Sequence, residues 1–223
     1  MVKSVVLLSG GLDSLVSLGL KKEELNVELA LTFHYGQKSA HKEIEACKKI
    51  CEFYGIKHKV IDLNWLKEIT ATSLVSNSEI PKGDLLDSPV DSMKAVWVPN
   101  RNGLFVNIAA CFADSFGYDY IIIGANKEEA ETFIDNSQDF IDAVNCEMKY
   151  STQVIPKIVA PLINYDKNGI VKLALEHGIP LDLTMSCYEH SEGHCGKCES
   201  CSRLKKALEA NNDSKYLKSL FGD

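Results

Sequence analysis

The stretch that decides the fold is Ser9-Gly10-Gly11-Leu12-Asp13-Ser14, between the apolar run Val5–Leu8 and the helical pattern Leu12–Leu20. Glycines permit positive φ and close backbone approach, so successive N–H groups can converge on an anion. The helix N-terminus near Asp13 directs its partial positive charge to the same place. We therefore predict a strand–turn–helix unit whose turn binds phosphate, with the acidic side chain suited to a phosphate that is bound with Mg2+.

The turn differs from the two best-known phosphate motifs. It is neither G-x-x-x-x-G-K-[ST] nor G-x-G-x-x-G, which argues against a P-loop and a dinucleotide-binding fingerprint. Ser9 and Ser14 add hydroxyl donors for phosphate oxygens. A plain tight turn with Asp13 or Ser14 as a helix cap is the simpler alternative. The position directly after a first strand favours the phosphate site.

The rest of the chain alternates between strand and helix patterns. Further strands are predicted over Val27–Phe33, His58–Leu63 and Tyr120–Ile123, and helices over Lys38–Tyr54 and Asn102–Phe116. This alternation predicts an α/β fold with a doubly wound, mostly parallel sheet. We expect a domain over residues 1–184 and a small metal-binding unit over residues 185–223, packed on the same domain.

Two segments depart from the alternation. Ser73–Ala95 is rich in Ser, Asp, Pro and Gly, and we interpret it as an excursion or a mobile lid. In the C-terminal unit we predict a helix over Ser200–Ala210, followed by a polar tail.

Composition and charge restrict the function. The 223 residues are 45% hydrophobic and carry a net charge of −7, which argues against a broadly basic nucleic-acid-binding surface. No apolar run is long enough to cross a bilayer. The short apolar run Val5–Leu8 is interpreted as a strand rather than a signal peptide, so we expect a cytoplasmic protein with a small-molecule substrate and no membrane or stable nucleic-acid partner.

Four of the eight cysteines lie within fifteen residues: Cys187, Cys195, Cys198 and Cys201. Four thiolates satisfy tetrahedral zinc and leave no position for a catalytic water, so we predict a structural site. An iron–sulfur cluster remains open, since four thiolates hold those as well. His190 and His194 are weaker alternative ligands. The scattered cysteines are interpreted as buried small hydrophobes: Cys47, Cys51, Cys111 and Cys146.

The turn resembles the PP-loop, S-G-G-x-D-S, of the ATP pyrophosphatase superfamily. From Val5 to about Arg203 the chain also resembles the 7-cyano-7-deazaguanine synthase family. The matching pieces, besides the turn, are Tyr35-Gly36-Gln37, Val98-Pro99-Asn100-Arg101-Asn102, Gly124-Ala125-Asn126, Pro161-Leu162, Thr184-Met185-Ser186-Cys187-Tyr188 and Cys195-Gly196-Lys197-Cys198-x2-Cys201. Their order along the chain is far more specific than the PP-loop alone.

The resemblance implies a fold like that of the adenine nucleotide alpha hydrolases and a ligase of queuosine or archaeosine biosynthesis. Such an enzyme converts 7-carboxy-7-deazaguanine and ammonia to a nitrile through adenylylated carboxylate and amide intermediates. It also implies ATP with Mg2+, one structural zinc ion per chain, and a homodimer.

The resemblance also assigns site residues. ATP binding is implied for Leu8, Ser9, Gly10, Gly11, Leu12, Asp13, Ser14, Leu15, Val16, Ser17 and Leu18. Catalytic roles are implied for Asp13, Ser14 and Arg101. Substrate contacts are expected from Tyr35, Gln37, Arg101, Asn126, Phe133 and Asp135, with the guanidinium suited to a phosphate or a carboxylate.

The chain departs from the family pattern over Glu128–Phe140, where an aromatic at Phe133 and the acid Asp135 are kept but the usual Pro, Cys and Arg are lost. Lys38 also replaces the usual Arg. These differences leave open another PP-loop enzyme, such as a tRNA thiolase or an amide ligase. A zinc-stabilised nucleic-acid-binding module is a further alternative, which would leave the PP-loop unexplained.

Overall fold

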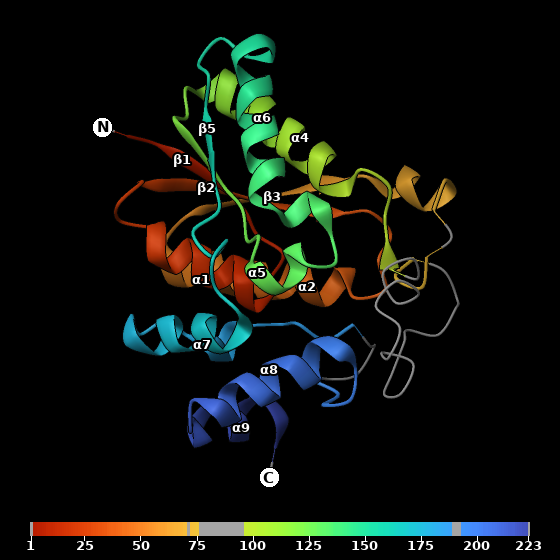
Figure 1. Ribbon diagram of the computed structural model, residues 1–223, viewed down its shortest axis with the longest axis vertical. Helices are drawn as coiled ribbons and strands as arrows, with labels where there is room; N and C mark the ends of the chain where they lie inside the picture. The colour runs from red at the N-terminus through yellow and green to blue at the C-terminus, as the bar shows by residue number, and fades with distance from the viewer. Residues whose placement is uncertain (1, 71, 76–95, 189–192, 223) are drawn as a thin grey trace.

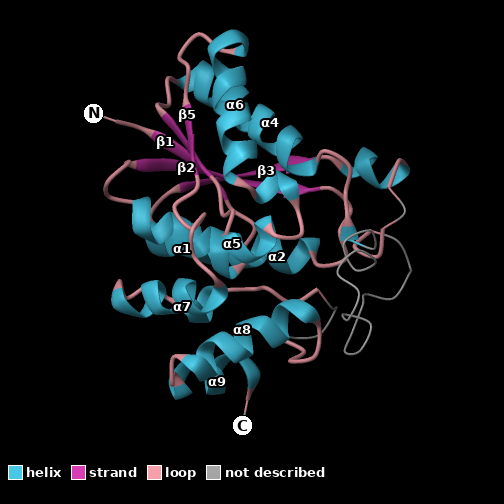
Figure 2. Cartoon of the chain, viewed as in Figure 1, coloured by secondary structure: helices cyan, strands magenta, loops and turns pink. Residues whose placement is uncertain are grey.

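The computed structural model describes residues 2–70, 72–75, 96–188 and 193–222. Within these residues, one parallel sheet lies between two layers of helices (Figure 1, Figure 2). Its strands are β1 (Ser4–Leu7), β2 (Val27–His34), β3 (Lys57–Asp62), β4 (Tyr120–Ile122) and β5 (Lys157–Val159). The longer helices are α1 (Leu12–Lys21), α2 (Ala40–Tyr54), α4 (Arg101–Phe116), α6 (Gln138–Ser151), α7 (Lys167–Glu176), α8 (Glu199–Ala210) and α9 (Ser214–Phe221). Short helices are η1 (Asn64–Glu68), α5 (Lys127–Ala130), η3 (Ile134–Asn136) and η4 (Leu181–Leu183).

The strand order β3-β2-β1-β4-β5 places β1 at the centre of the sheet, and every pairing is parallel. The chain leaves β1 toward β2 on one side, and β4 pairs on the other side. In open α/β sheets such a reversal of strand order leaves a crevice at the carboxyl ends of the strands, where ligands bind. The turn after β1 therefore lies at the expected ligand-binding edge.

Each face of the sheet has its own core. On one face, α1, α2 and α7 pack through fully buried residues such as Leu15, Ile50 and Ile170. On the other face, α4 and α6 contribute residues such as Val106 and Met148. The β-branched and apolar residues of the central strands are buried on both faces, as a parallel sheet covered by two helical layers requires.

The predicted elements are present, and their bounds agree with the structure to within two residues. Among the elements whose bounds no sequence pattern predicted are α6 and β5. β5 has only three residues, too few for a strand periodicity to be visible. Most of the predicted excursion, residues 76–95, lies outside the described residues.

Two sequence predictions were wrong. Most of the polar tail forms helix α9, and Asp213 caps this helix by accepting a hydrogen bond from the backbone N–H of Tyr216 at 2.6 Å. Its few apolar residues, including the buried Tyr216, are spaced to face the core, so a mostly polar segment is still helical. Cys111 and Cys146 are exposed on the outer sides of α4 and α6, whereas the buried positions of Cys47 and Cys51 are confirmed.

The side chains of α8 and α9 join the same core as α1. Leu204, Leu208 and Tyr216 lie in one apolar cluster with Leu12 and Leu15. The C-terminal helices are therefore packed against the sheet domain through α7 and do not form a separate core. Among the described residues, no helix has both the length and the apolar character needed to span a bilayer.

Candidate nucleotide site and metal centre

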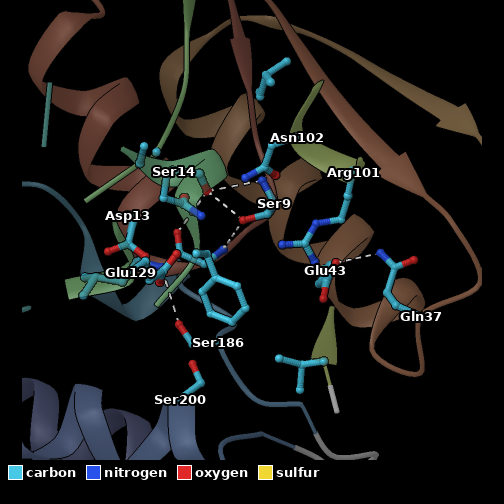
Figure 3. A pocket seen from close by; sticks show the side chains of 18 of the residues that line it. Ser9, Asp13, Ser14, Gln37, Glu43, Arg101, Asn102, Glu129, Ser186 and Ser200 are labelled. Carbon is cyan, nitrogen blue, oxygen red and sulfur yellow. Dashed lines mark hydrogen bonds between the residues drawn. The ribbon is translucent and has the colours of Figure 1, made fainter. Parts of the chain in front are cut away.

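The turn after β1 is compact and internally hydrogen-bonded (Figure 3). The backbone N–H of Ser9 donates to the Ser14 Oγ at 3.2 Å, and that hydroxyl donates to the Gly11 carbonyl at 3.1 Å. Gly10 has φ +78°, and a Cβ there would lie 3.0 Å from the backbone oxygen of Glu43. Only glycine fits this position, because the conformation and the space both exclude a side chain.

The loop after β4 closes against this turn. A Cβ on Gly124 would lie 2.9 Å from the backbone nitrogen of Ser14 and 3.1 Å from the carbonyl carbon of Asp13. The missing side chain lets the two loops touch backbone to backbone. The carboxyl ends of β1 and β4 are thus joined into one wall of the cavity at the point where the strand order reverses.

Asp13 forms a charged cluster with residues distant in sequence. Lys167, the first residue of α7, places its Nζ 2.6 Å from the Asp13 Oδ2 and 3.0 Å from the Glu129 Oε1. The Lys167 side chain is only 13% exposed. Burial opposes the charge of Lys167, but the two carboxylates raise its pKa well above the usual range. The cluster is therefore a charged ammonium held between two carboxylates, beside the PP-loop.

The two carboxylates differ in their preference for the charged form. Burial raises the pKa of Asp13, and Lys167 offsets this only in part. Burial also raises the pKa of Glu129, but Lys167, Asn126 and Arg101 together outweigh it and lower the pKa of that carboxyl. The Oδ1 atom of Asp13 is buried and has no hydrogen-bond partner within the described residues. An unpartnered, buried carboxylate oxygen is suited to a cation or a donor brought by a ligand.

Lys167 was not among the site residues predicted from the sequence, although its position after Asp166 is unusual for a lysine. Asp166 caps α7 by accepting the backbone N–H of Gly169 at 2.7 Å, so Lys167 stands in the first turn of that helix. A cation there opposes the helix dipole. A lysine directly after a helix-capping aspartate therefore indicates that another charge compensates it.

The opposite end of the cavity is built around Arg101, the first residue of α4. Its Nη1 donates to the Tyr35 hydroxyl at 3.2 Å, and the guanidinium lies 5.7 Å from the centre of that ring. Burial opposes the charge, but Tyr35 and Asp135 raise the pKa of Arg101, so the side chain stays protonated. Burial raises the pKa of Asp135, and Arg101 offsets part of this effect.

Aromatic rings flank this end of the cavity. Trp97 and Phe133 lie nearly parallel, 6.2 Å apart between ring centroids and 10° apart in plane. Phe33 and Phe105 stack at 4.0 Å on the side nearer the sheet. Flat apolar walls of this kind favour a flat heteroaromatic ligand.

The buried Gln37 and the half-buried Glu43 form a polar pair near Arg101 (Figure 3). The Gln37 amide is fully engaged: its oxygen accepts from the Tyr35 N–H at 2.9 Å, and its nitrogen donates to the Phe33 carbonyl and to Glu43 at 3.0 and 2.8 Å. Burial raises the pKa of Glu43, with the hydrogen bonds from Ser39 and Gln37 opposing this. Gln37 thus orients Tyr35 and Glu43 and has no free amide hydrogen for a ligand.

One cavity of about 320 Å3 connects the two ends. Of the residues predicted from sequence, its lining includes Leu8, Ser9, Gly11, Leu12, Asp13, Ser14, Tyr35, Gln37, Arg101, Phe133 and Asp135. Gly10 lies behind the turn, and Leu15, Val16, Ser17 and Leu18 are buried in the core, so these five are absent from the lining. Asn126 also lies outside the lining; it caps α5 by accepting the Glu129 N–H at 3.0 Å. The lining further includes residues not predicted as site residues, among them Glu43, Trp97, Glu129, Lys167, Ser186 and Arg203.

The four clustered cysteines of the C-terminal unit converge. Ligand atoms of Cys187, Cys195, Cys198 and Cys201 all lie within 4.8 Å of one another. Backbone N–H groups of Lys197 and Cys198 donate to the Cys195 Sγ at 3.4 and 3.3 Å. The hydrogen bond from Cys201 lowers the pKa of the Cys198 thiol to about 5. The same pairing raises the pKa of Cys201, so it is the convergence of the four ligand atoms that indicates a metal site.

The sequence also offered His190 and His194 as alternative metal ligands. The Nε2 of His194 accepts the backbone N–H of Ser186 at 3.2 Å, and His194 does not belong to the converging group. His190 lies outside the described residues.

Known proteins resemble this chain over nearly its whole length. The chain is 54% identical over 215 residues to a 7-cyano-7-deazaguanine synthase of Carboxydothermus hydrogenoformans, covering 95% of this chain and 100% of that protein. It is 48% identical over 217 residues to a protein of the same name from Methanosarcina mazei, covering 93% and 94%. A 4-thiouridine synthetase solved as an RNA complex with bound ATP has the same fold, with a TM-score of 0.51 at 20% identity over 97% of this chain and 52% of that one. The model of the family described as queuosine biosynthesis protein QueC matches residues 3–212, and the chain belongs to this family of enzymes.

Proposed function

We propose that this enzyme makes 7-cyano-7-deazaguanine from 7-carboxy-7-deazaguanine, ammonia and two molecules of ATP. The observation that carries the proposal is the single cavity with a phosphate-binding turn at one end and an arginine among aromatic rings at the other. The first end suits the polyphosphate of ATP, and the second suits a flat heterocycle that bears a carboxylate.

The chemistry uses one kind of step twice. A carboxylate oxygen of the substrate attacks the α-phosphorus of ATP, and pyrophosphate leaves from the PP-loop. Ammonia then attacks the acyl carbon, AMP leaves, and the nitrogen loses a proton to give the amide. The amide oxygen attacks a second ATP in the same way and pyrophosphate leaves again; loss of AMP and of both nitrogen-bound protons then gives the nitrile. AMP supplies the leaving group that a carboxylate or an amide lacks at neutral pH.

The residues divide this work between the two ends. Backbone N–H groups and hydroxyls of Ser9–Ser14 stabilise the charge on the departing pyrophosphate. Lys167 fixes Asp13, whose free Oδ1 is available to the hydrated Mg2+ that accompanies ATP. Arg101 orients the substrate carboxylate, Asp135 accepts the N–H groups of a guanine-type edge, and Phe133 stacks on the ring. Asn126 acts indirectly, by fixing the loop that carries Glu129.

For the four cysteines we propose one structural zinc ion. Tetrahedral zinc with bonds of about 2.3 Å separates its sulfur ligands by about 3.8 Å. The closeness of the four ligand atoms, all within 4.8 Å, supports a single ion over a larger iron–sulfur cluster. Four thiolates leave no open position, so the ion supplies stability and no chemistry.

We further propose that the chain works in the cytoplasm as a homodimer on free small molecules, without a nucleic-acid partner. Its two parts are residues 1–184, with the nucleotide site, and the metal-binding unit 185–223. Light scattering at two protein concentrations measures the mass, and a mass of 24.7 kDa at both would contradict the dimer.

The decisive experiment is incubation of metal-loaded protein with ATP, Mg2+, ammonium chloride and 7-carboxy-7-deazaguanine, with products identified by mass spectrometry. Nitrile should accumulate with two AMP per product, and amide should appear before nitrile. Absence of both AMP and nitrile would refute the proposal. AMP formed only with a different carboxylic acid would show an adenylylating enzyme whose substrate we had assigned wrongly.

A further inference from the structure

The PP-loop is held by residues that lie next to the first clustered cysteine, two of which also line the cavity. We call Thr184, Met185 and Ser186 the strap. The backbone N–H of Met185 donates to the Gly10 carbonyl at 2.7 Å, and the Thr184 hydroxyl lies 3.4 Å from the same oxygen as a second donor. Thr184 is 3% exposed, so this contact is sealed from water.

Fixing the Gly10 carbonyl also fixes a donor of the nucleotide site. The carbonyl of Gly10 and the N–H of Gly11 belong to one planar trans peptide and point in opposite directions. Because the carbonyl is held toward the strap, the N–H of Gly11 is turned away from it, toward the Ser9 hydroxyl at 3.4 Å. Gly10 at φ +78° has no side chain to resist rotation of this peptide, so the two hydrogen bonds from the strap add a restraint to those made by Gly11 inside the turn.

The strap touches the turn at a further point. The Ser186 hydroxyl accepts the N–H of Leu12 at 3.4 Å, at the first residue of α1 (Figure 3). The Ser186 oxygen thus contacts one of the N–H groups at the start of α1, where an anion would accept hydrogen bonds.

The other side of the strap is anchored in the cysteine loop. Ser186 donates its backbone N–H to the Nε2 of His194, and Cys187 follows directly. The Sγ of Cys187 accepts the backbone N–H of Cys195 at 3.4 Å. The segment has little apolar area of its own; its small buried cluster consists of Cys187, Cys198 and Cys201. A metal ion that joins these thiolates would therefore determine where the strap lies.

We propose that metal binding at the four cysteines sets the affinity for ATP. A bound metal ion fixes the position of the strap, and the hydrogen bonds of the strap then fix the orientation of the Gly10–Gly11 peptide. Thr184 is a positioning residue in this coupling. The inference rests on the proposed nucleotide site and goes beyond a purely local structural role for the metal.

The test measures binding of a non-hydrolysable ATP analogue with Mg2+ by calorimetry, together with metal content. Thr184→Val keeps the β-branched shape but removes the hydroxyl, and should raise the Kd about threefold without loss of metal. Thr152→Val is the matched control, because Thr152 donates to the Met148 carbonyl at 2.8 Å in α6, on the opposite face of the sheet. This control should leave the Kd unchanged.

Removing the metal with a chelator should raise the Kd at least about tenfold while the far-ultraviolet circular dichroism of the sheet domain persists, and added Zn2+ should restore binding. Equal affinity of the folded metal-loaded and metal-free proteins would overturn the inference, and so would equal affinity of Thr184→Val and the unaltered protein. If the metal-free protein unfolds, the Thr184→Val comparison decides alone. Failure of the unaltered, metal-loaded protein to bind the analogue would instead refute the nucleotide site itself.

Discussion

At the PP-loop end of the cavity, five of the six consecutive residues Ser9–Ser14 line the wall, together with Glu129, Lys167 and Ser186. At the Arg101 end the wall consists of side chains from separate segments, including Tyr35 after β2, Trp97 before α4 and Phe133 after α5. A phosphate is recognised by charge and donors, which any short turn can supply. A flat heterocycle needs apolar side chains on its faces and hydrogen-bonding groups at its edge. Only packed helices and strands hold such side chains at defined distances from one another. Substitutions should therefore affect chemistry at the first end and substrate choice at the second.

Asp13→Ala should have the largest effect. It removes the carboxylate from the PP-loop end, and we expect kcat/KM to fall by about 1,000-fold or more. Lys167 keeps Glu129 as a partner at 3.0 Å, so no buried charge is left alone and the protein should stay folded. AMP release measures the activity, and thermal unfolding checks the fold. Activity within tenfold of the unaltered enzyme would remove Asp13 from the site.

Cys198→Ser should reduce stability by more than about 4 kcal/mol and abolish stoichiometric metal binding, since four thiolates hold the proposed ion. Cys146→Ser is the control, because Cys146 is exposed on α6 and remote from the cluster. Urea unfolding and elemental analysis are the measurements. A stable, metal-loaded Cys198→Ser protein would rule out the proposed ligand set.

Arg101→Lys should reduce kcat/KM for the carboxylate substrate by about 100-fold. Lysine keeps the charge but loses the planar fork and the contact with Tyr35. ATP binding at the other end should be nearly unchanged, which separates the two ends in one variant. If ATP affinity falls as steeply as the substrate's kcat/KM, Arg101 belongs to the phosphate end instead.

Phe133→Ala should raise KM for the heterocyclic substrate by about tenfold, because it removes one of two parallel rings. The KM for ATP should stay the same. Phe116→Ala removes an exposed ring at the far end of α4 and serves as the control. Equal KM values in the unaltered protein and Phe133→Ala would place the ring outside the substrate pocket.

Asp135→Asn should have the smallest effect of these substitutions. In the ligand-free protein it should raise stability slightly, whereas Cys198→Ser lowers it. Burial raises the folded-state pKa of Asp135 above its unfolded value, so the contribution of this group to stability is complete below the unfolded pKa and is lost as pH rises through the folded pKa. At pH 7 the variant should therefore be slightly more stable, and the difference should disappear below about pH 4. Thermal unfolding at several pH values measures this. A variant that is less stable at pH 7 would contradict the direction.

The sequence determined those features whose cause is local. Ser9–Ser14 predicts its own turn, because glycine conformation, helix N-terminus and hydroxyl donors all lie within six residues. The four cysteines predict a common metal centre because three of them lie within seven residues of one another. The strand and helix patterns predict the α/β sheet, because period and length act along the chain.

Only the tertiary structure decided the rest. Lys167 is 154 residues from Asp13, and no local pattern pairs them. From the sequence, the Gln37 amide is a candidate to bind the substrate. In the structure its oxygen and both N–H groups are already hydrogen-bonded to backbone groups of Phe33 and Tyr35 and to Glu43. Leu15–Leu18 continue the PP-loop in sequence yet turn into the core, because a helix presents only one end to the cavity. A side chain's chemistry is written in the sequence, but whether that chemistry is still free to meet a ligand depends on which neighbours the fold brings to it.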